Sequence, residues 1–240
     1  MTSINILFED DDVLVLDKPA GITVNRSDTT RGQETVQDWI EKTKGQFSQN
    51  KESDFYKRNG IVHRIDKETS GILLVAKNVQ AFENLQKQFK ERVIEKTYLA
   101  LVHGKVVPEK GEINVPVERL PWDRKKFGVL AGGKEAVTLY SVLSTFKLEL
   151  SKHKIEELTL LELNPKTGRT HQIRVHLKYF NHPIFSDYIY AGRKTAREDR
   201  KILNRVFLHA HKITFLHPKT NKKISIESPL PFELSQLINK

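Results

Sequence analysis

One carboxylate stands out in a polar loop between two apolar segments. Asp66 lies in the run HRIDKETSG at residues 63–71, directly before the apolar segment ILLVAK. A carboxylate fixed beside a buried strand is suited to act as a nucleophile or as a general base. The alternative is a turn aspartate whose side chain accepts backbone N–H groups from Thr69 or Ser70. The local sequence alone favours this structural interpretation.

A second group of polar residues occurs in TGRTHQIRVHL at residues 167–177. Its spacing predicts a helix over about residues 170–180, with an apolar stripe and a polar stripe beside it. An arginine on such an inward-leaning flank pairs with a carboxylate, either as a structural salt bridge or to keep a buried acid ionised. The apolar stripe would contain Ile173, Leu177 and Phe180, and the polar stripe His171, Arg174 and Lys178.

Strand patterns outnumber helix patterns around these two motifs, and several look hairpin-linked. Besides the helix at 170–180, we expect helices at 34–44, after the N-cap Asn78 and at the C-terminus, and a surface loop at 45–60. This pattern predicts an α+β fold with a mixed, mainly antiparallel sheet flanked by helices. Strands are expected at residues 5–7, 12–17, 72–77, 97–106, 111–118, 136–147, 155–163, 206–216 and 222–227.

Charge and composition narrow the classes of function. Among 240 residues, 40 Lys and Arg oppose 30 Asp and Glu, which leaves a formal charge of +10 and suggests a polyanionic partner. The absence of cysteine excludes disulfides, cysteine-ligated metal sites and cysteine nucleophiles. No apolar run is long enough to span a bilayer, and the acidic start MTSINILFEDDD is unlike a signal peptide. We therefore expect a cytoplasmic protein without a membrane partner.

Motifs for cofactors and metals are weak. The run GVLAGGK at 128–134 has the spacing of a phosphate-binding loop, but Glu135 replaces the hydroxyl that would bind magnesium, so we interpret it as a hairpin turn. His209 and His211 share one strand face without a local third ligand, and structural histidines are the simpler interpretation. Neither a dinucleotide fingerprint nor a serine-nucleophile motif is present. We expect no nucleotide cofactor, no other cofactor and no metal.

Five motifs in order carry a resemblance to a known family. They are HRIDKETSGILLVAK, EKTYLALVHG, TGRTHQIRVHL, HPIFSDYIYAG and RVFLHAHKITFLHP, preceded by ILFEDDDVLVLDKPAGITV and followed by SPLP near residue 231. The chain resembles the RluA-type pseudouridine synthases over nearly its whole length. The resemblance implies one catalytic domain over residues 1–240 with a central catalytic cleft, without the small S4-type RNA-binding module of some relatives.

The resemblance also implies roles for four residues. Asp66 matches the essential catalytic aspartate, and Arg64 the arginine that helps to displace the target nucleotide from its helix. Tyr98, which follows Lys96 in a K-x-Y motif, matches the tyrosine that packs against the flipped base. Arg174 matches the basic residue that pairs with the aspartate. The implied activity is an isomerase that converts specific uridines of rRNA or tRNA to pseudouridine.

Two basic segments are candidates for RNA contact, because phosphate contacts and aromatic stacking favour nucleic acid. One surrounds Trp122 and Phe127, and the other spans residues 193–205; the alternative is two solvated faces. A rival function is a catalytically inactive RNA-binding or ribosome-assembly factor on the same fold. We expect a monomer that binds RNA. The predicted RNA contacts are Arg119, Arg124, Lys125, Lys126, Arg169, His171, Arg193, Lys194 and Arg197.

Overall fold

The chain folds into two compact units in the computed structural model, which describes residues 3–27, 30, 32–151 and 154–238. The first unit contains residues 1–96 and 210–229, and the second contains residues 97–209 and 230–240. The first unit is therefore built from two separate stretches of sequence. The expectation of one catalytic domain over the whole chain stays a prediction.

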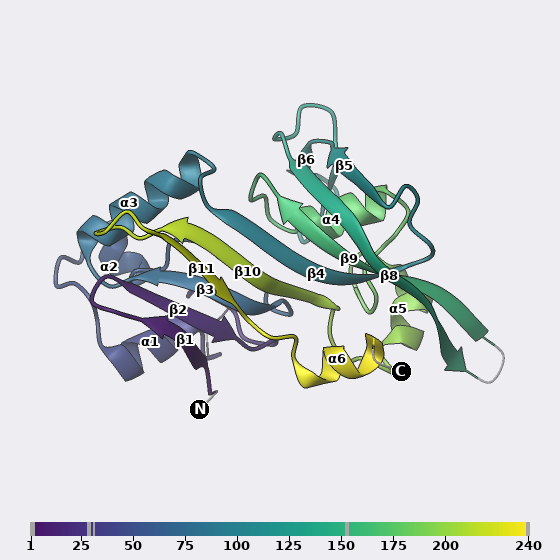
Figure 1. Ribbon diagram of the computed structural model, residues 1–240, viewed down its shortest axis with the longest axis horizontal. Coiled ribbons are helices and arrows are strands. Elements are labelled where there is room, and N and C mark those ends of the chain that lie inside the picture. The colour runs from purple at the N-terminus through teal and green to yellow at the C-terminus, as the bar shows by residue number, and fades with distance from the viewer. Residues whose placement is uncertain (1–2, 28–29, 31, 152–153, 239–240) are drawn as a thin grey trace. The chain divides into compact units, whose positions relative to one another are not determined.

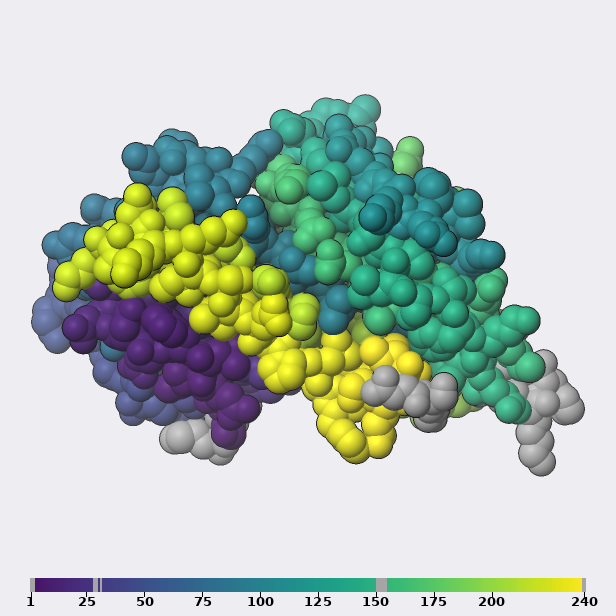
Figure 2. All heavy atoms as spheres, in the orientation of Figure 1, coloured from purple at the N-terminus to yellow at the C-terminus, as the bar shows by residue number. Residues whose placement is uncertain are grey.

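The sheet of the first unit has the strand order β1-β2-β3-β10-β11. The pairs β1–β2, β2–β3 and β10–β11 are antiparallel, and Val13 opposite Ala76 sets the register of the central pair. Figure 2 shows the segment 210–229, in yellow, beside the N-terminal strands, in purple. The strands are β1 (Asn5–Glu9), β2 (Val13–Lys18), β3 (Ser70–Ala76), β10 (Leu208–Leu216) and β11 (Lys223–Glu227).

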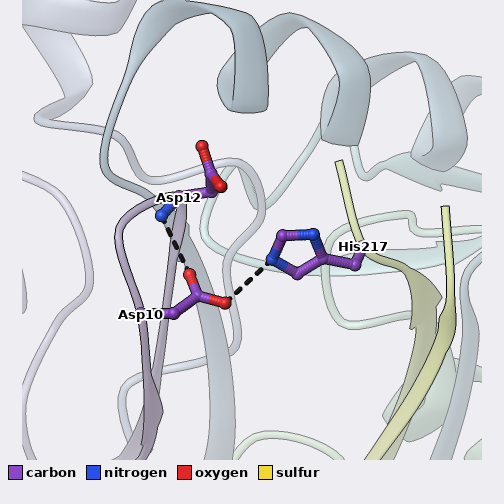
Figure 3. Close-up of side chains that lie close together, drawn as sticks. All are labelled: Asp10, Asp12 and His217. Carbon is purple, nitrogen blue, oxygen red and sulfur yellow. Dashed lines mark hydrogen bonds and ion pairs between the residues drawn. The ribbon is translucent and has the colours of Figure 1, made fainter. Parts of the chain in front are cut away.

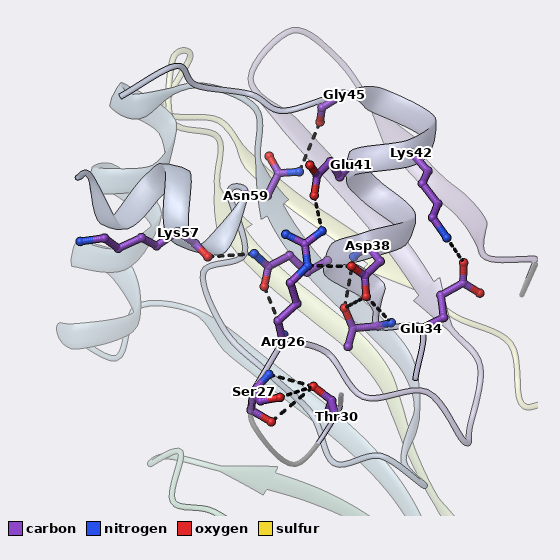
Figure 4. Close-up of polar contacts among 12 residues, drawn as sticks. Arg26, Ser27, Thr30, Glu34, Asp38, Glu41, Lys42, Gly45, Lys57 and Asn59 are labelled. Atoms are coloured by element: carbon purple, nitrogen blue, oxygen red, sulfur yellow. Dashed lines mark hydrogen bonds and ion pairs between the residues drawn. The ribbon is translucent and has the colours of Figure 1, made fainter. Parts of the chain in front are cut away.

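Helix α1 (Val36–Lys44) confirms the helix expected at 34–44, and its start is fixed by local hydrogen bonds. Thr35 and Asp38 form a capping box, in which each side chain accepts the backbone N–H of the other residue. The Arg26 guanidinium binds Asp38 and Glu41 on the same helix (Figure 4). These contacts anchor the segment before α1 to its first two turns.

The expected surface loop at 45–60 is partly wrong, because it contains helix α2 (Asp54–Arg58). Ser53 caps this helix, and Phe55 is buried against the first unit's core. Asn59, also buried, accepts the backbone N–H of Phe47. Its side chain also donates to the carbonyl of Gly45 (Figure 4). Five helical residues are too few for a clear helical pattern, which explains why the sequence did not reveal them.

Helix α3 (Val79–Lys90) begins as expected after Asn78, whose side chain accepts the backbone N–H of Ala81. Its residues Phe82 and Leu85 are buried in the same core as strand β3. The helix therefore covers the sheet that carries the HRID segment. None of the helices in the described part of the chain has the length and apolar character needed to cross a bilayer.

The second unit has a sheet of order β4-β9-β8-β5 (Figure 1) and a separate hairpin of β6 and β7. The pairs β4–β9, β8–β9, β5–β8 and β6–β7 are all antiparallel. The α+β fold with a mainly antiparallel sheet is therefore confirmed. The strands are β4 (Glu95–His103), β5 (Lys110–Asn114), β6 (Val117–Arg119), β7 (Phe127–Val129), β8 (Val137–Ser151) and β9 (Lys154–Pro165).

Three helices complete the second unit: α4 (Gln172–Tyr179), α5 (Arg193–Asp199) and α6 (Phe232–Ile238). Helix α5 was not expected, because its sequence RKTARED has only one apolar residue, Ala196. The run GVLAGGK is a turn, as predicted: Gly133 donates to the carbonyl of Leu130, and Lys134 pairs with Val117 at the base of the hairpin.

Candidate active site

Asp66 lies half-buried in the loop that leads into strand β3, and Arg64 lies exposed two residues before it. The N–H of Thr69 donates to the main-chain carbonyl of Asp66 at 3.1 Å, which closes a turn over residues 66–69. The expected turn is confirmed, and the bond that closes it uses the backbone carbonyl of Asp66. That the Asp66 side chain accepts the N–H of Thr69 or Ser70 stays a prediction.

The half-buried His63 anchors the loop on its upstream side. Nε2 of His63 accepts the backbone N–H of Leu74 in β3 at 2.8 Å, and the ring packs on Phe89 with centroids 4.9 Å apart. Burial, together with the charge of Lys96, lowers the pKa of His63 to about 3, and burial lowers the pKa of Lys96 to about 8. His63 is therefore neutral, which suits an acceptor that fixes the chain just before Asp66.

Lys18, at the end of β2, anchors the loop on its downstream side. Its side chain is fully buried, and Nζ donates to the carbonyls of Pro19, Ile22 and Lys67 at 2.9, 2.9 and 3.2 Å. The Lys67 carbonyl also accepts the N–H of Gly21 at 2.8 Å. The residue that follows Asp66 is thus bound to the turn after β2, which restrains the position of the carboxylate.

Replacing Lys18 tests this anchor. We expect Lys18→Met to reduce the free energy of unfolding by about 2–4 kcal/mol, because three carbonyls, of which that of Ile22 is buried, lose a charged donor. Urea denaturation would measure the change. Lys57→Met, which removes an exposed lysine of the same unit whose ion pair with Glu52 spans 3.7 Å, is the control and should be nearly neutral. A loss no larger than the control would show that Lys18 does not hold the loop.

Strand β3 can enter the sheet at this point only with glycine at position 71. Gly71 has φ +105°, and a Cβ there would lie 2.3 Å from the carbonyl oxygen of Ala210 in β10. Only glycine tolerates both the left-handed backbone and this close approach. The glycine of the HRIDKETSG run therefore sets how closely the loop that holds Asp66 is packed on the sheet.

Tyr98 and Arg174 belong to the second unit. Tyr98 is half-buried on β4, opposite Leu163 of β9, and packs against the second unit's core. Arg174, on α4, is 6% exposed and binds the fully buried Asp187: Nε lies 2.8 Å from Oδ2 and Nη2 lies 2.9 Å from Oδ1. A bidentate pair of this kind fixes the plane of the guanidinium.

Asp187 was missed in the sequence, although it lies in the motif HPIFSDYIYAG. Its Oδ1 also accepts the backbone N–H groups of Ile189 and Tyr190, at 3.0 and 3.1 Å. The sequence predicts that Arg174 pairs with a carboxylate, either in a structural salt bridge or to keep a buried acid ionised, but Asp66 was the only partner it named. The pairing of Arg174 with Asp66 stays a prediction, and the pairing of Arg174 with Asp187 is a finding.

The start of helix α4 differs from the expected one. The helix begins at Gln172, and His171 precedes it with φ +57°, so the predicted polar stripe of His171, Arg174 and Lys178 is wrong. The cause is the Gln172 side chain: its Oε1 accepts from Thr167 Oγ1 at 2.7 Å and from the Arg169 N–H at 3.0 Å, which ties the first turn to the preceding loop. The apolar stripe is confirmed, since Ile173, Leu177 and Phe180 all pack in the core.

A buried ion cluster supports the segment that holds Asp187. His103 Nε2 lies 3.0 Å from Asp199 Oδ2 and its Nδ1 lies 2.6 Å from Glu156 Oε1; Asp199 also accepts the N–H of Ser186. Burial opposes the charge on His103, but the hydrogen bonds and charges of Asp199 and Glu156 outweigh burial and raise its pKa. With a carboxylate at each nitrogen, the ring is held as an imidazolium.

This cluster predicts a pH dependence of stability. Because the folded-state pKa of His103 is raised, its stabilisation is complete below the unfolded value of about 6.5 and is lost as the pH rises through the folded value. We expect the free energy of unfolding to decline above pH 6.5 and His103→Gln to remove this part of the slope. Urea denaturation between pH 6 and pH 9 measures both slopes. Equal slopes in the two proteins would contradict the assignment.

Basic side chains surround the hairpin of β6 and β7. The Arg119 guanidinium lies 4.8 Å from the ring centroid of Phe127 and donates to the carbonyl of Arg124, and Trp122 at the tip is 74% exposed. Of the predicted RNA contacts, Arg119, Arg124, Lys125, Arg169, Arg193, Lys194 and Arg197 are exposed, and Lys126 and His171 are half-buried.

Three other basic residues of the segment 193–205 form hydrogen bonds or ion pairs within the protein. Arg200 Nε donates to the carbonyl of Ser186 at 3.0 Å, Lys201 pairs with Glu198 at 2.6 Å, and the buried Arg205 donates to the carbonyl of Leu208. The charge run therefore divides into exposed residues on α5 and two arginines, Arg200 and Arg205, that bind main-chain carbonyls; the ion pair of Lys201 lies on the surface.

Within the described residues, one cluster contains three side chains of the kinds that bind metal ions (Figure 3). It is formed by Asp10, Asp12 and His217. His217 Nδ1 accepts the N–H groups of Lys219 and Thr220 at 3.2 Å, which places the proton on Nε2, 2.8 Å from Asp10 Oδ2. Asp10 Oδ1 in turn accepts the N–H of Asp12. Both ring nitrogens are engaged, so hydrogen bonding between two turns accounts for this group.

Comparison with known proteins identifies the family. The family of RNA pseudouridylate synthases matches residues 12–179. The tRNA pseudouridine synthase C of Haemophilus ducreyi is 35% identical over 99% of this chain and 95% of its own length. The ribosomal large subunit pseudouridine synthase D of Neisseria meningitidis serogroup B is 35% identical over 99% of this chain and 61% of its own.

Solved structures agree with these sequence matches. The human RNA pseudouridylate synthase domain containing 1 superimposes with a TM-score of 0.73 and 27% identity, over 96% of this chain and 84% of its own. The family expected from the five motifs is thus confirmed by sequence and by fold. The chain belongs to the RNA pseudouridylate synthase family.

Proposed function

We propose that the chain isomerises uridine to pseudouridine in rRNA or tRNA and that Asp66 is its catalytic carboxylate. The observation that carries the assignment is the restraint of the Asp66 loop on both sides, by His63 upstream and by Lys18 and Gly21 downstream. A reacting group must be held in place by its surroundings to act efficiently. The half-buried position of Asp66 keeps it within reach of a substrate.

The reaction balances without an external group or a redox change. The bond between uracil N1 and ribose C1′ breaks, the uracil rotates, and a bond forms between C5 and C1′. The proton leaves C5 and N1 gains one, so the base keeps its composition. An ionised carboxylate serves this chemistry either as a nucleophile or as a base at the ribose.

Arg174 and Tyr98 are the proposed partners of Asp66. A guanidinium stabilises the charged form of a nearby carboxylate, and Arg174 is held with a fixed plane by Asp187. Tyr98 offers a half-buried ring as a stacking surface for the uracil. We assign Tyr98 to stacking and positioning.

The target base must leave its helix, because its reacting atoms are inaccessible in a stacked duplex. Flipping costs a few kcal/mol, which phosphate contacts and an inserted side chain offset. Arg64 is exposed two residues from Asp66 and suits insertion. The exposed basic residues on the β6–β7 hairpin and on α5 are the proposed phosphate contacts. We also propose that the protein acts as a monomer in the cytoplasm.

Tritium release from RNA labelled at uracil C5 tests the proposal. Ribosomal and transfer RNA transcripts are offered separately, with EDTA present, and release into water is measured over time. Release from one transcript, followed by detection of pseudouridine in the digested RNA, establishes the activity and names the substrate class. Binding of both transcripts without release from either would favour the inactive RNA-binding factor.

A further inference from the structure

One tyrosine of the second unit contacts three parts of the proposed site. The backbone N–H of Tyr190 donates to Asp187 Oδ1, and its ring lies 5.0 Å from the Arg174 guanidinium carbon. Its hydroxyl lies 2.8 Å from His171 Nδ1 and accepts the backbone N–H of Phe127 at 3.1 Å. The residue thus touches Arg174, the start of α4 and strand β7 at once.

The contact with β7 matters because that strand belongs to the basic hairpin. Phe127 packs in a small apolar cluster with Val117, Val175 and Tyr190, and its ring lies under Arg119. The chain just after the base of the hairpin is also bonded to the loop before α4, because Arg169 Nε donates to the carbonyl of Glu135 at 3.1 Å. The tip beyond Phe127 carries the exposed residues Trp122, Arg124 and Lys125.

We propose that Tyr190 is a positioning residue whose hydroxyl holds the β6–β7 hairpin at a fixed place relative to Arg174. Its ring and backbone fix it to the Arg174–Asp187 pair, and its hydroxyl fixes β7 to it. The hairpin thereby presents its cations and Trp122 to RNA from a defined position. The RNA part of this inference rests on the proposed function.

Tyr190→Phe isolates the hydroxyl, because the ring under Arg174 and the backbone bond to Asp187 stay in place. Loss of this hydrogen bond should speed amide hydrogen exchange at Phe127 by about threefold to tenfold. Tyr188→Phe is the matched control, since Tyr188 lies in the same segment and is 65% exposed. We expect exchange in the control to equal that of the wild type.

Kinetics supply the second readout. With the transcript that the wild type modifies, Tyr190→Phe should raise KM by about the same threefold to tenfold and change kcat by less than about twofold, because the hairpin binds RNA and does not touch the reacting atoms. A merely structural residue would lower the amount of folded enzyme, and hence the measured kcat, without moving KM.

The outcomes separate this inference from the proposed function. Unchanged exchange at Phe127 overturns the positioning role, and so does a lower kcat with an unchanged KM. If the wild type modifies neither transcript, the proposed function fails, and dissociation constants for the two transcripts replace KM. Faster exchange with weaker RNA binding would then still support the role of Tyr190.

Discussion

Asp66→Asn should reduce the rate of pseudouridine formation by about 10³-fold or more and leave RNA affinity within about twofold. Asparagine keeps the size and the hydrogen-bonding oxygen of aspartate, but it cannot act as a nucleophile or as a base at the ribose. The turn over residues 66–69 uses the main-chain carbonyl of Asp66, which the substitution retains. The loop should therefore keep its shape.

Tritium release under single-turnover conditions measures the chemical step, and filter binding of the same transcript measures affinity. Glu68→Gln is the matched control, because it removes a carboxylate of the same loop, two residues away, that is half-buried like Asp66. We expect the control to retain most of the wild-type rate. An Asp66→Asn protein with a rate near that of the control would rule out Asp66 as the catalytic carboxylate.

The motifs allowed the family to be predicted, and apolar patterns gave the α+β class and most strand positions. Some strands show alternation, and β3 shows a continuous apolar run because all its residues are buried. The two short helices were not predicted from the sequence. Helix α2 is fixed by the cap Ser53 and the buried Phe55, and α5 by tertiary contacts. The start of α4 was misplaced because the Gln172 side chain fixes it. Besides its bonds to the preceding loop, this side chain donates to Val137 and Thr138, which lie more than 30 positions away.

The anchors of the site were missed for the same reason. From the sequence, Lys18 resembles an ordinary surface lysine beside a turn. The structure shows that it is fully buried and binds the Lys67 carbonyl, 49 residues away. Asp187 was visible as part of a motif, but its distance of 13 residues from Arg174 follows no helix or strand period. Side chains that reach between elements are set by packing, which local spacing does not encode.

The Arg174–Asp187 pair raises the question of whether Arg174 serves structure or catalysis, and two variants can separate these roles. Arg174→Met leaves the buried Asp187 carboxylate without its guanidinium, which should cost about 3 kcal/mol of unfolding free energy. Adding Asp187→Asn removes the stranded charge and keeps an oxygen for the N–H groups of Ile189 and Tyr190. We expect the double variant to recover about 1–2 kcal/mol of that loss.

Activity should respond differently from stability. If Arg174 stabilises the ionised Asp66, the double variant stays at least about a hundredfold slower than the wild type even though it is more stable than Arg174→Met, because neither variant has the guanidinium. Urea denaturation and tritium release on the same three proteins make the comparison. Recovery of rate in parallel with stability would mean that Arg174 only neutralises Asp187. A stable but slow double variant would instead show that the Arg174 guanidinium interacts with two carboxylates. Asp187 would hold it in place, and the guanidinium would keep Asp66 ionised.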